Sequence, residues 1–558
     1  MSKILAGIAA GFLIAVCCPL PAQPVDVAAA LPQVVMTHSG PVQGIRVAGG
    51  SARAWLGLPY AAPPVGGRRW RATQPHESWT QVFKADTYGS PCVQIGSIYG
   101  PPPAGRDWGL ANADAFGKPV GSEDCLTLNI WRPDSEERDL PVFVFIHGGA
   151  GVAGYSADPT YDGAKLAVGA DAVVITLNYR LGIFGAFLHP ALQSGDALDD
   201  SGAFATLDMI QALRFVQANA AAFGGDPGNV TLAGQSAGAI AVYTLVGSKL
   251  ARGLFQKAVA MSGLIGSGST DRHKSYDFAE RVTASLAVRD GLAPTSESAA
   301  KLVAAKGTAW VRDYLLSRSS GEILETLQLH PDLLKGAPPQ YADGTVVPVD
   351  LAGAYDRGEF NRVPMIIGAT RDEARLFVSG VFKVSNAQRF TMMLQTDPDA
   401  APRLQPKDII SAALLPCLGG GLYRAYSSVL TAILMRGVNA SISKVARYEP
   451  AVYAYRFDWN RGPVPWNTVY GAAHAIDLPF LFGNFSHNFF AMDFSTRNRP
   501  GREALSGVMM KTLAAFMRRG DPNISELASP WRPWNVKDGP RRKLVLDATD
   551  DRLALSVD

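Results

Sequence analysis

One five-residue segment, residues 234–238 (Gly-Gln-Ser-Ala-Gly), restricts the fold of this chain more than any other feature. A strand-like apolar run, residues 229–233, precedes it, and a helix-like run follows to about residue 246. A serine between glycines in a tight strand-to-helix turn is the pattern of a nucleophile elbow. Such a turn strains the serine backbone, and the glycines keep side chains out of the corner. By itself the pentapeptide also fits an ordinary turn of small residues.

The composition is that of an ordinary globular protein. The chain has 558 residues, 47% hydrophobic and 18% charged, so a core of this size needs no disulfide or metal. Its 52 basic and 49 acidic residues are spread along the chain and leave a net charge of +3. No basic block indicates nucleic-acid binding, and no stretch after the N-terminal segment is apolar enough to predict a membrane span.

The N-terminal segment predicts export. An uncharged apolar run, residues 4–16, has the length of a signal peptide and is short for a membrane span. Residues 20–22 and 28–30 both offer small residues for cleavage, and we place the signal peptide at residues 1–22. The mature protein is then expected to be secreted or periplasmic. Cysteines directly after this run raise a lipoprotein alternative, which the bulky Val16 before them disfavours.

Three cysteines remain after the signal segment. An exported protein meets an oxidising compartment, so one disulfide and one unpaired thiol is the simplest arrangement. Pairing of Cys92 with Cys125 would close a local loop. Cys417 lies in an apolar run, residues 412–418, and is expected to be a small buried hydrophobe.

Strand-like and helix-like runs alternate along the chain. The strand-like runs, continuous and apolar as in buried parallel strands, are residues 141–146, 172–177, 257–262, 363–368 and 452–457. Helical patterns cover residues 203–223 and 501–519. This alternation predicts the α/β class, with a mostly parallel central sheet flanked by helices. Residues 34–558 are expected to form a single domain with helical insertions near residues 270–340 and 385–447.

A long surface loop is predicted at residues 96–122, which are rich in glycine and proline. Long ordered loops in enzymes are often functional. Tyr99 and Trp108 either line a pocket rim from this loop or anchor its local packing.

A serine nucleophile needs a base and an acid that orients the base. His474 lies in a small-residue loop late in the chain, as the order serine, acid, histidine requires. The strand-like run at residues 363–368 leads into Asp372 and Glu373, and the residue pattern leaves both open as the acid.

A glycine loop, residues 148–151 (Gly-Gly-Ala-Gly), follows the strand-like run at residues 141–146. It has no bulky side chains, so its backbone N–H groups can approach a developing oxyanion. A plain glycine turn is the alternative, and the serine elbow downstream makes the oxyanion site the better interpretation.

Together these motifs resemble the type-B carboxylesterase/cholinesterase family of α/β-hydrolases, in particular its bacterial para-nitrobenzyl-esterase-like members. Residues 123–131 (EDCLTLNIW) and 223–231 (FGGDPGNVT) are similar to the two long signatures of that family. The resemblance extends from about residue 40 over nearly all of the mature chain. It implies an α/β-hydrolase fold with a gorge that leads to the serine.

The resemblance also implies roles for individual residues. The triad would be Ser236, Glu373 and His474. The oxyanion donors would be the backbone N–H groups of Gly149, Ala150 and Ala237. Cys92 and Cys125 match the first disulfide of the family, and Glu123 and Arg69 match an ion pair near it.

Two positions depart from the family pattern. Gln235 stands where many members have glutamate, which removes a negative charge near the serine and disfavours cationic alcohols such as choline esters. Gly151 stands where the family has an aromatic residue, so the pocket wall there is expected to be more open. A neutral or bulky ester is the expected substrate.

The expected protein is therefore a serine hydrolase that cleaves small carboxylic esters through an acyl-enzyme, without a metal or cofactor. A non-catalytic cholinesterase-like binding protein on the same fold is the competing class. An amidase or carbamate hydrolase would use the same site. The acyl and alcohol preference and the oligomeric state do not follow from the sequence.

Overall fold

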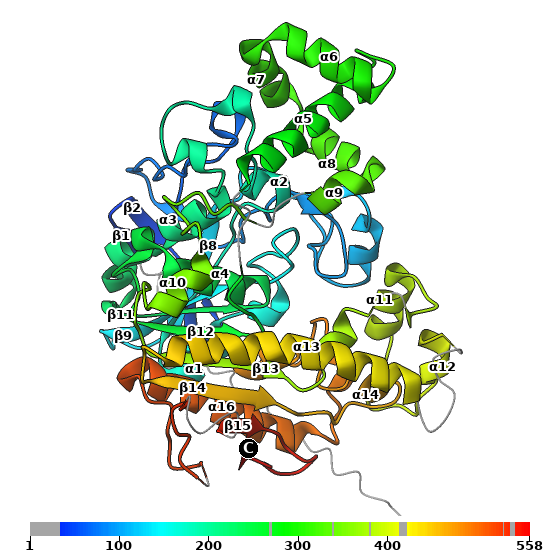
Figure 1. The fold of residues 1–558 in the computed structure, drawn as a ribbon. Helices are drawn as coiled ribbons and strands as arrows, with labels where there is room; N and C mark the ends of the chain where they lie inside the picture. The colour runs from blue at the N-terminus through cyan, green and yellow to red at the C-terminus, as the bar shows by residue number, and fades with distance from the viewer. Residues whose placement is uncertain are drawn as a thin grey trace, which may run out of the picture.

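The computed structural model describes residues 34–266, 271–336, 340–378, 381–411, 421–527, 529–535 and 542–558. The expected signal peptide and Cys417 lie outside the described residues. A central sheet lies between layers of helices, and helices α5 to α9 form a lobe that projects from one end of the molecule (Figure 1).

The central sheet has 11 strands in the order β16-β15-β14-β13-β12-β11-β9-β10-β8-β4-β3. The strands from β15 to β10 in this order, β9 included, pair in parallel. Strands β8, β4 and β3 at one edge and β16 at the other pair in antiparallel fashion. This confirms the predicted α/β class with a mostly parallel sheet. The strands of this sheet are β3 (Ile45–Val47), β4 (Ala52–Pro59), β8 (Thr127–Pro133), β9 (Leu140–Ile146), β10 (Val173–Leu177), β11 (Gly225–Gln235), β12 (Lys257–Met261), β13 (Met365–Thr370), β14 (Val452–Phe457), β15 (Lys543–Leu546) and β16 (Ser556–Val557).

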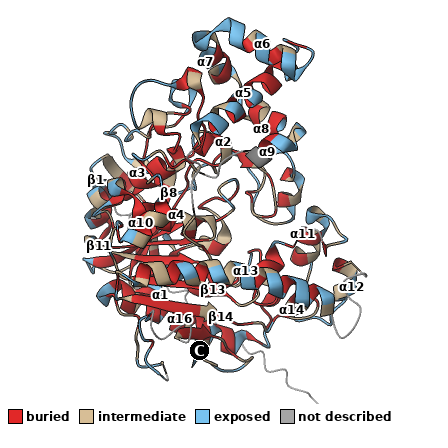
Figure 2. Cartoon of the chain, in the orientation of Figure 1, coloured by how far each residue is buried: buried red, intermediate tan, exposed pale blue. Residues whose placement is uncertain are grey.

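The central strands are buried on both faces, as their unbroken apolar sequences predict. Every residue of β9 is buried, and so is every residue of β10 and β13. Figure 2 shows this buried centre, with exposed residues concentrated on the outer helices. Outside the sheet lie the short strands β1 (Val34–Thr37), β2 (Gly40–Gln43), β5 (Phe83–Lys84), β6 (Gln94–Ile95) and β7 (Pro119–Val120).

The helices cover the sheet and build the two expected helix-rich segments. The helices outside these two segments lie between strands of the central sheet along the chain. They are α1 (Ala164–Ala170), α2 (Gly182–Gly185), α3 (Phe204–Asn219), α4 (Ala237–Gly247), α10 (Leu351–Arg357), α14 (Trp466–Val469), α15 (Asp477–Phe482) and α16 (Arg499–Arg519). The first segment holds α5 (Arg272–Arg289), α6 (Ser296–Lys306), α7 (Thr308–Ser317), α8 (Ser320–Leu329) and α9 (Pro331–Gly336). The second holds α11 (Asn386–Leu394), α12 (Pro406–Ile409) and α13 (Gly421–Ala446).

Helix α13 is the one described helix that is long and apolar enough to cross a bilayer. Only 22% of its most apolar window is buried within the protein. A single helix of this kind is weak evidence for a membrane span, because helices of soluble proteins meet the same criteria of length and composition.

The strand order places a crevice at one end of the sheet. Strand β9 pairs with β10 on one side and with β11 on the other, so the connections after β9 and β11 leave in different directions. In open α/β sheets, ligands bind outside the carboxyl ends of the strands at such a switch point. The glycine loop follows β9 and Ser236 follows β11, so both lie at this crevice.

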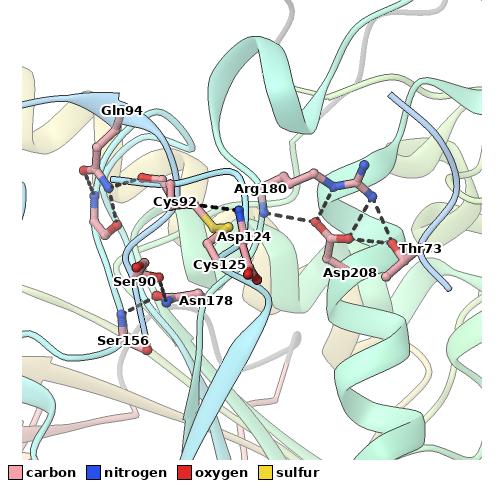
Figure 3. The surroundings of a disulfide bond; sticks show 12 residues. Thr73, Ser90, Cys92, Gln94, Asp124, Cys125, Ser156, Asn178, Arg180 and Asp208 are labelled. Carbon is pink, nitrogen blue, oxygen red and sulfur yellow. Dashed lines mark hydrogen bonds and ion pairs between the residues drawn. A yellow bond between two sulfur atoms is a disulfide. The ribbon is translucent and has the colours of Figure 1, made fainter. Parts of the chain in front are cut away.

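A disulfide joins Cys92 to Cys125, in the segment that leads to the central sheet (Figure 3). Beside it, the Gln94 side chain donates to the Gly154 carbonyl at 2.9 Å and accepts from the Gly154 N–H at 2.9 Å. Asn178 donates to the Ser90 carbonyl at 3.0 Å. The disulfide-linked segment is therefore attached directly to the chain just after the glycine loop, at Gly154.

Two ion pairs lie near this segment, one partly buried and one fully buried. Arg69 binds Glu123, with 2.6 Å between Arg69 Nε and Glu123 Oε2. Arg180 donates to both oxygens of Asp208 on α3 at 2.8 Å, and the exposed fractions of the two side chains are 4% and 0% (Figure 3). The Arg180–Asp208 pair depends on both partners, because either charge alone would be buried without an opposite charge to compensate for its lost hydration.

We expect Asp208→Asn to lower the free energy of unfolding by about 3 kcal/mol, because Arg180 would keep its charge without a counter-charge. Urea denaturation followed by circular dichroism measures the change. Asp313→Asn is the control, since Asp313 pairs with Arg312 on the surface and should change stability by less than about 0.5 kcal/mol. Equal losses in the two variants would contradict this account of the buried pair.

Candidate active site

Ser236 occupies the turn between β11 and α4 in a strained backbone conformation, with φ 58° and ψ −122°. Its N–H donates to the Met261 carbonyl on β12 at 2.9 Å, which ties the turn to the neighbouring strand. A Cβ at Gly234 would lie 2.3 Å from the Gly238 carbonyl oxygen, and one at Gly238 would lie 2.1 Å from the Ile146 carbonyl oxygen. Both glycines are therefore required by the close approach of backbone, as expected for a nucleophile elbow.

His474 and Glu373 meet although they are far apart in the sequence. His474 Nδ1 lies 2.5 Å from Glu373 Oε2, and both side chains are almost fully buried. The other carboxylate oxygen, Oε1, accepts from the Ser262 hydroxyl at 2.5 Å and from the Thr370 N–H at 2.7 Å. The parallel strands β12, β13 and β14 are neighbours, so the loops at their carboxyl ends bring these groups together.

The environment of Glu373 keeps its carboxylate ionised. Burial alone raises the pKa of Glu373, but its charge interaction and hydrogen bond with His474 lower it. The donors Ser262 and Thr370 lower it further, and the resulting pKa lies below the ordinary value of 4.5. An ionised carboxylate at Nδ1 fixes the tautomer in which Nε2 carries the lone pair.

Asp372, the other acid that the residue pattern left open, has a different environment. It pairs with Arg371 at 2.9 Å and with Arg375 at 3.0 Å, and it accepts from the Ala472 N–H at 3.0 Å. Its carboxylate anchors the loop that carries His474, whereas Glu373 contacts the imidazole itself.

The Gln235 amide occupies the other side of the imidazole. Gln235 Nε2 lies 2.9 Å from His474 Nε2, and Gln235 is 2% exposed. Because Nδ1 faces Glu373, Nε2 is the acceptor and the amide is the donor. Among the described residues no hydrogen bond joins Ser236 to His474. The Gln235 amide must therefore move away from His474 Nε2 before that nitrogen can accept a proton from the serine.

The glycine loop presents backbone N–H groups near the serine. Gly149 has φ +104° and Ala150 has φ +57°. A Cβ at Gly149 would lie 2.0 Å from the Ala153 carbonyl oxygen, so only glycine fits there. Within the described part of the chain, no backbone acceptor receives the N–H of Gly149, Ala150 or Ala237. A Cβ at Gly151 would meet no atom within 4 Å, in agreement with the open wall expected there.

His147 supports this loop and is not a second base. Its ring stacks on Tyr179 at 4.6 Å and its Nδ1 lies 2.8 Å from the Gly148 carbonyl oxygen. Burial lowers the pKa of His147 to about 4, so the ring is neutral at physiological pH. The Gln94 contacts with Gly154 hold the chain three residues after the same loop.

A pocket of about 350 Å³ contains these groups. Ser236, Gln235, His474 and the glycine loop line it, together with Asp158 and a set of aromatic side chains. Tyr99 from the long loop lines the pocket, whereas Trp108 packs edge-on against Phe390 at 6.0 Å and anchors the loop locally. The pocket thus combines a serine, a base and N–H donors in one largely apolar space.

Two contacts of the site were not predicted. Ser262, which donates to Glu373, has φ 54° and follows β12 directly. Its place at the carboxyl end of a predicted strand is the only sequence signal for it. Phe377 packs on the His474 ring at 4.7 Å, and no sequence pattern indicates that contact.

Known proteins resemble this chain over almost its whole length. The model of the carboxylesterase family matches residues 31–554. The chain belongs to the carboxylesterase family. The para-nitrobenzyl esterase of Bacillus subtilis (strain 168) is 33% identical over 518 residues, which cover 92% of this chain and 95% of that protein. A medium-chain fatty acyl-CoA hydrolase precursor of Anas platyrhynchos is 32% identical, over 92% of this chain and 88% of that protein.

Solved structures of this carboxylesterase family agree with the sequence comparison. A para-nitrobenzyl esterase structure superposes with a TM-score of 0.70 at 29% identity, over 94% of this chain and 97% of that chain. The protein therefore has the α/β-hydrolase fold and is a carboxylic ester hydrolase. The family expected from the signature motifs is confirmed, and relatives named as esterases do not support the non-catalytic alternative.

We expect Gln235→Glu to move the acid limb of the kcat/KM profile to higher pH by about one unit. A carboxylate beside His474 Nε2 favours the protonated imidazole, which cannot accept a proton from a nucleophile. Initial rates of ester hydrolysis across about pH 5 to 9 measure the limb. Gln235→Met removes the amide without adding charge, so it should shift the limb much less. An unmoved limb in Gln235→Glu would contradict a role for this contact in ionisation.

Proposed function

We propose that the protein hydrolyses carboxylic esters through an acyl-enzyme formed on Ser236. The observation that carries the proposal is the 2.5 Å contact between Glu373 and His474 at the pocket that contains the strained serine. A base oriented by a buried carboxylate, in the same pocket as a serine hydroxyl, is the arrangement that nucleophilic acyl transfer requires.

In the first half-reaction Ser236 Oγ bonds to the ester carbonyl carbon while His474 Nε2 takes the hydroxyl proton. The Glu373 carboxylate stabilises the imidazolium that results. Collapse of the tetrahedral intermediate breaks the bond to the alcohol oxygen, and His474 returns the proton to that oxygen. Water then attacks the acyl-enzyme with His474 again as base, and the acid leaves.

The backbone N–H groups of Gly149, Ala150 and Ala237 are proposed to bind the oxyanion of both intermediates. Their support is the absence of a competing backbone acceptor among the described residues and the small side chains around them. Each donor in such a site contributes about 3 kcal/mol to transition-state stabilisation, judged from the removal of one donor elsewhere. The open space at Gly151 suits a bulky ester.

We expect Ser236→Ala to abolish hydrolysis of a short p-nitrophenyl ester, and Glu373→Gln to lower kcat by about 10⁴-fold because the imidazole loses its orienting charge. Initial rates at neutral pH give both values, and circular dichroism verifies that each variant is folded.

Asp372→Asn is the matched control for Glu373→Gln. It changes the adjacent carboxylate, which contacts Arg371, Arg375 and the Ala472 N–H but not the imidazole. A loss of less than about tenfold is expected. A larger loss in Asp372→Asn than in Glu373→Gln would move the acid to Asp372, and full activity in Ser236→Ala would refute the nucleophile.

We also propose that the protein is exported to the periplasm or secreted. The apolar run at residues 4–16 and the Cys92–Cys125 disulfide support this, because disulfides persist in oxidising compartments. Expression in a bacterium should give a periplasmic or secreted product that lacks about the first 22 residues by intact mass. A cytoplasmic product with an intact N-terminus would contradict export.

A further inference from the structure

The helical lobe holds a cavity that is separate from the active site. Its volume is about 750 Å³, against about 350 Å³ for the active-site pocket. Helices α5, α6, α7 and α9 and the short helix η5 (Pro190–Leu192) line it, in the part of the molecule that projects from one end (Figure 1). Among the described residues, none lines both spaces. We call this space the lobe cavity.

The buried side chains that line the lobe cavity are mostly apolar. They include Ala284, Val303, Val311 and Leu333. The polar ones are His189 at 4% exposed and Ser285 at 5% exposed. Sites for small molecules commonly have this volume and this combination of apolar walls with a few polar groups.

His189 places a hydrogen-bond donor without an acceptor at this cavity. Its Nδ1 accepts from the Ala191 N–H at 3.0 Å, so Nε2 carries the ring proton. Burial lowers the pKa of His189 to about 4, so the ring is neutral. In the described part of the chain, Nε2 has no hydrogen-bond partner. A buried donor without an acceptor is unfavourable, so a ligand that brings an acceptor would gain this hydrogen bond.

The ionised side chains of the lobe cavity belong to the exposed part of its lining. Asp277 and Glu280 on α5 are exposed, and neither forms an ion pair with another described residue. Arg281 and Asp332 pair with each other at 2.9 Å. The net charge of this lining is therefore negative, which disfavours a carboxylate ligand. An ammonium group would meet no counter-charge among the buried side chains, where it would lose its hydration.

We propose that the lobe cavity is a second binding site, for neutral and largely apolar molecules whose carbonyl oxygen accepts the His189 Nε2–H. The carbonyl supplies the acceptor that this donor lacks. The apolar body of the ligand contacts the buried side chains of α5, α6 and α7, and the exposed carboxylates of Asp277 and Glu280 repel anions. No residue of the active-site pocket takes part, so the site is independent of the proposed function of Ser236.

Photolabelling of the full chain with benzophenone tests the site. This neutral ketone attaches to nearby C–H bonds on irradiation, and peptide mass spectrometry locates the labels. We expect saturable labels in α5, α6 or α7. Butyrophenone should protect them, whereas butylbenzene, which lacks only the carbonyl oxygen, should need about fivefold higher concentration because it accepts no hydrogen bond. The anion 4-butyrylbenzoate should protect less well than butyrophenone, and this difference should shrink at high salt.

Two neighbouring alanines of α6 give a matched pair of variants. Ala304 and Ala305 are both exposed, but Ala304 lines the lobe cavity and Ala305 does not. The indole in Ala304→Trp should fill the cavity and abolish labelling of the lobe. Ala305→Trp should leave that labelling unchanged. Labels at the active-site pocket should be equal in both variants and in the wild-type protein.

His189→Asn tests the donor itself. The asparagine oxygen can still accept from the Ala191 N–H, but no group replaces Nε2–H. The benzophenone concentration for half-maximal labelling of the lobe should rise about fivefold, with circular dichroism unchanged. No label in the lobe, or lobe labels that persist in Ala304→Trp, would overturn the site. Equal protection by butyrophenone and butylbenzene would overturn the assigned ligand class.

Discussion

The backbone of Ser236, held at φ 58° between β11 and α4, is the constraint on which the site depends. A non-glycine residue keeps such a conformation only where the surrounding structure holds it. Here the Met261 carbonyl accepts the Ser236 N–H, and the carbonyls of Gly238 and Ile146 lie where a side chain at Gly234 or Gly238 would be. The serine can therefore be presented at this angle only when β11 is packed between β9 and β12.

The same strand order supplies the charge arrangement at the site. Parallel neighbours end at one edge of the sheet, so Ser262 after β12, Glu373 after β13 and His474 after β14 converge. The carboxylate of Glu373 tolerates burial because each of its oxygens has a close partner.

Much of this architecture could be predicted from local patterns. Continuous apolar runs located β9, β10, β13 and β14 to within two residues, because a strand buried on both faces has no polar alternation. Chain order and loop context made His474 the candidate base. The choice between Asp372 and Glu373 could not be made from those patterns, since adjacent carboxylates in a loop differ only in the direction of their side chains.

The sequence by itself determined the α/β class, the serine turn and the glycine loop, because each depends on residues that are close in the chain. Only the tertiary structure decided which groups face one another. The Gln235 amide at His474 Nε2 and the Ser262 hydroxyl at Glu373 both depend on strands and loops that are distant in sequence. Side-chain orientation at the ends of packed strands is a property of the assembled sheet, and no local pattern encodes it.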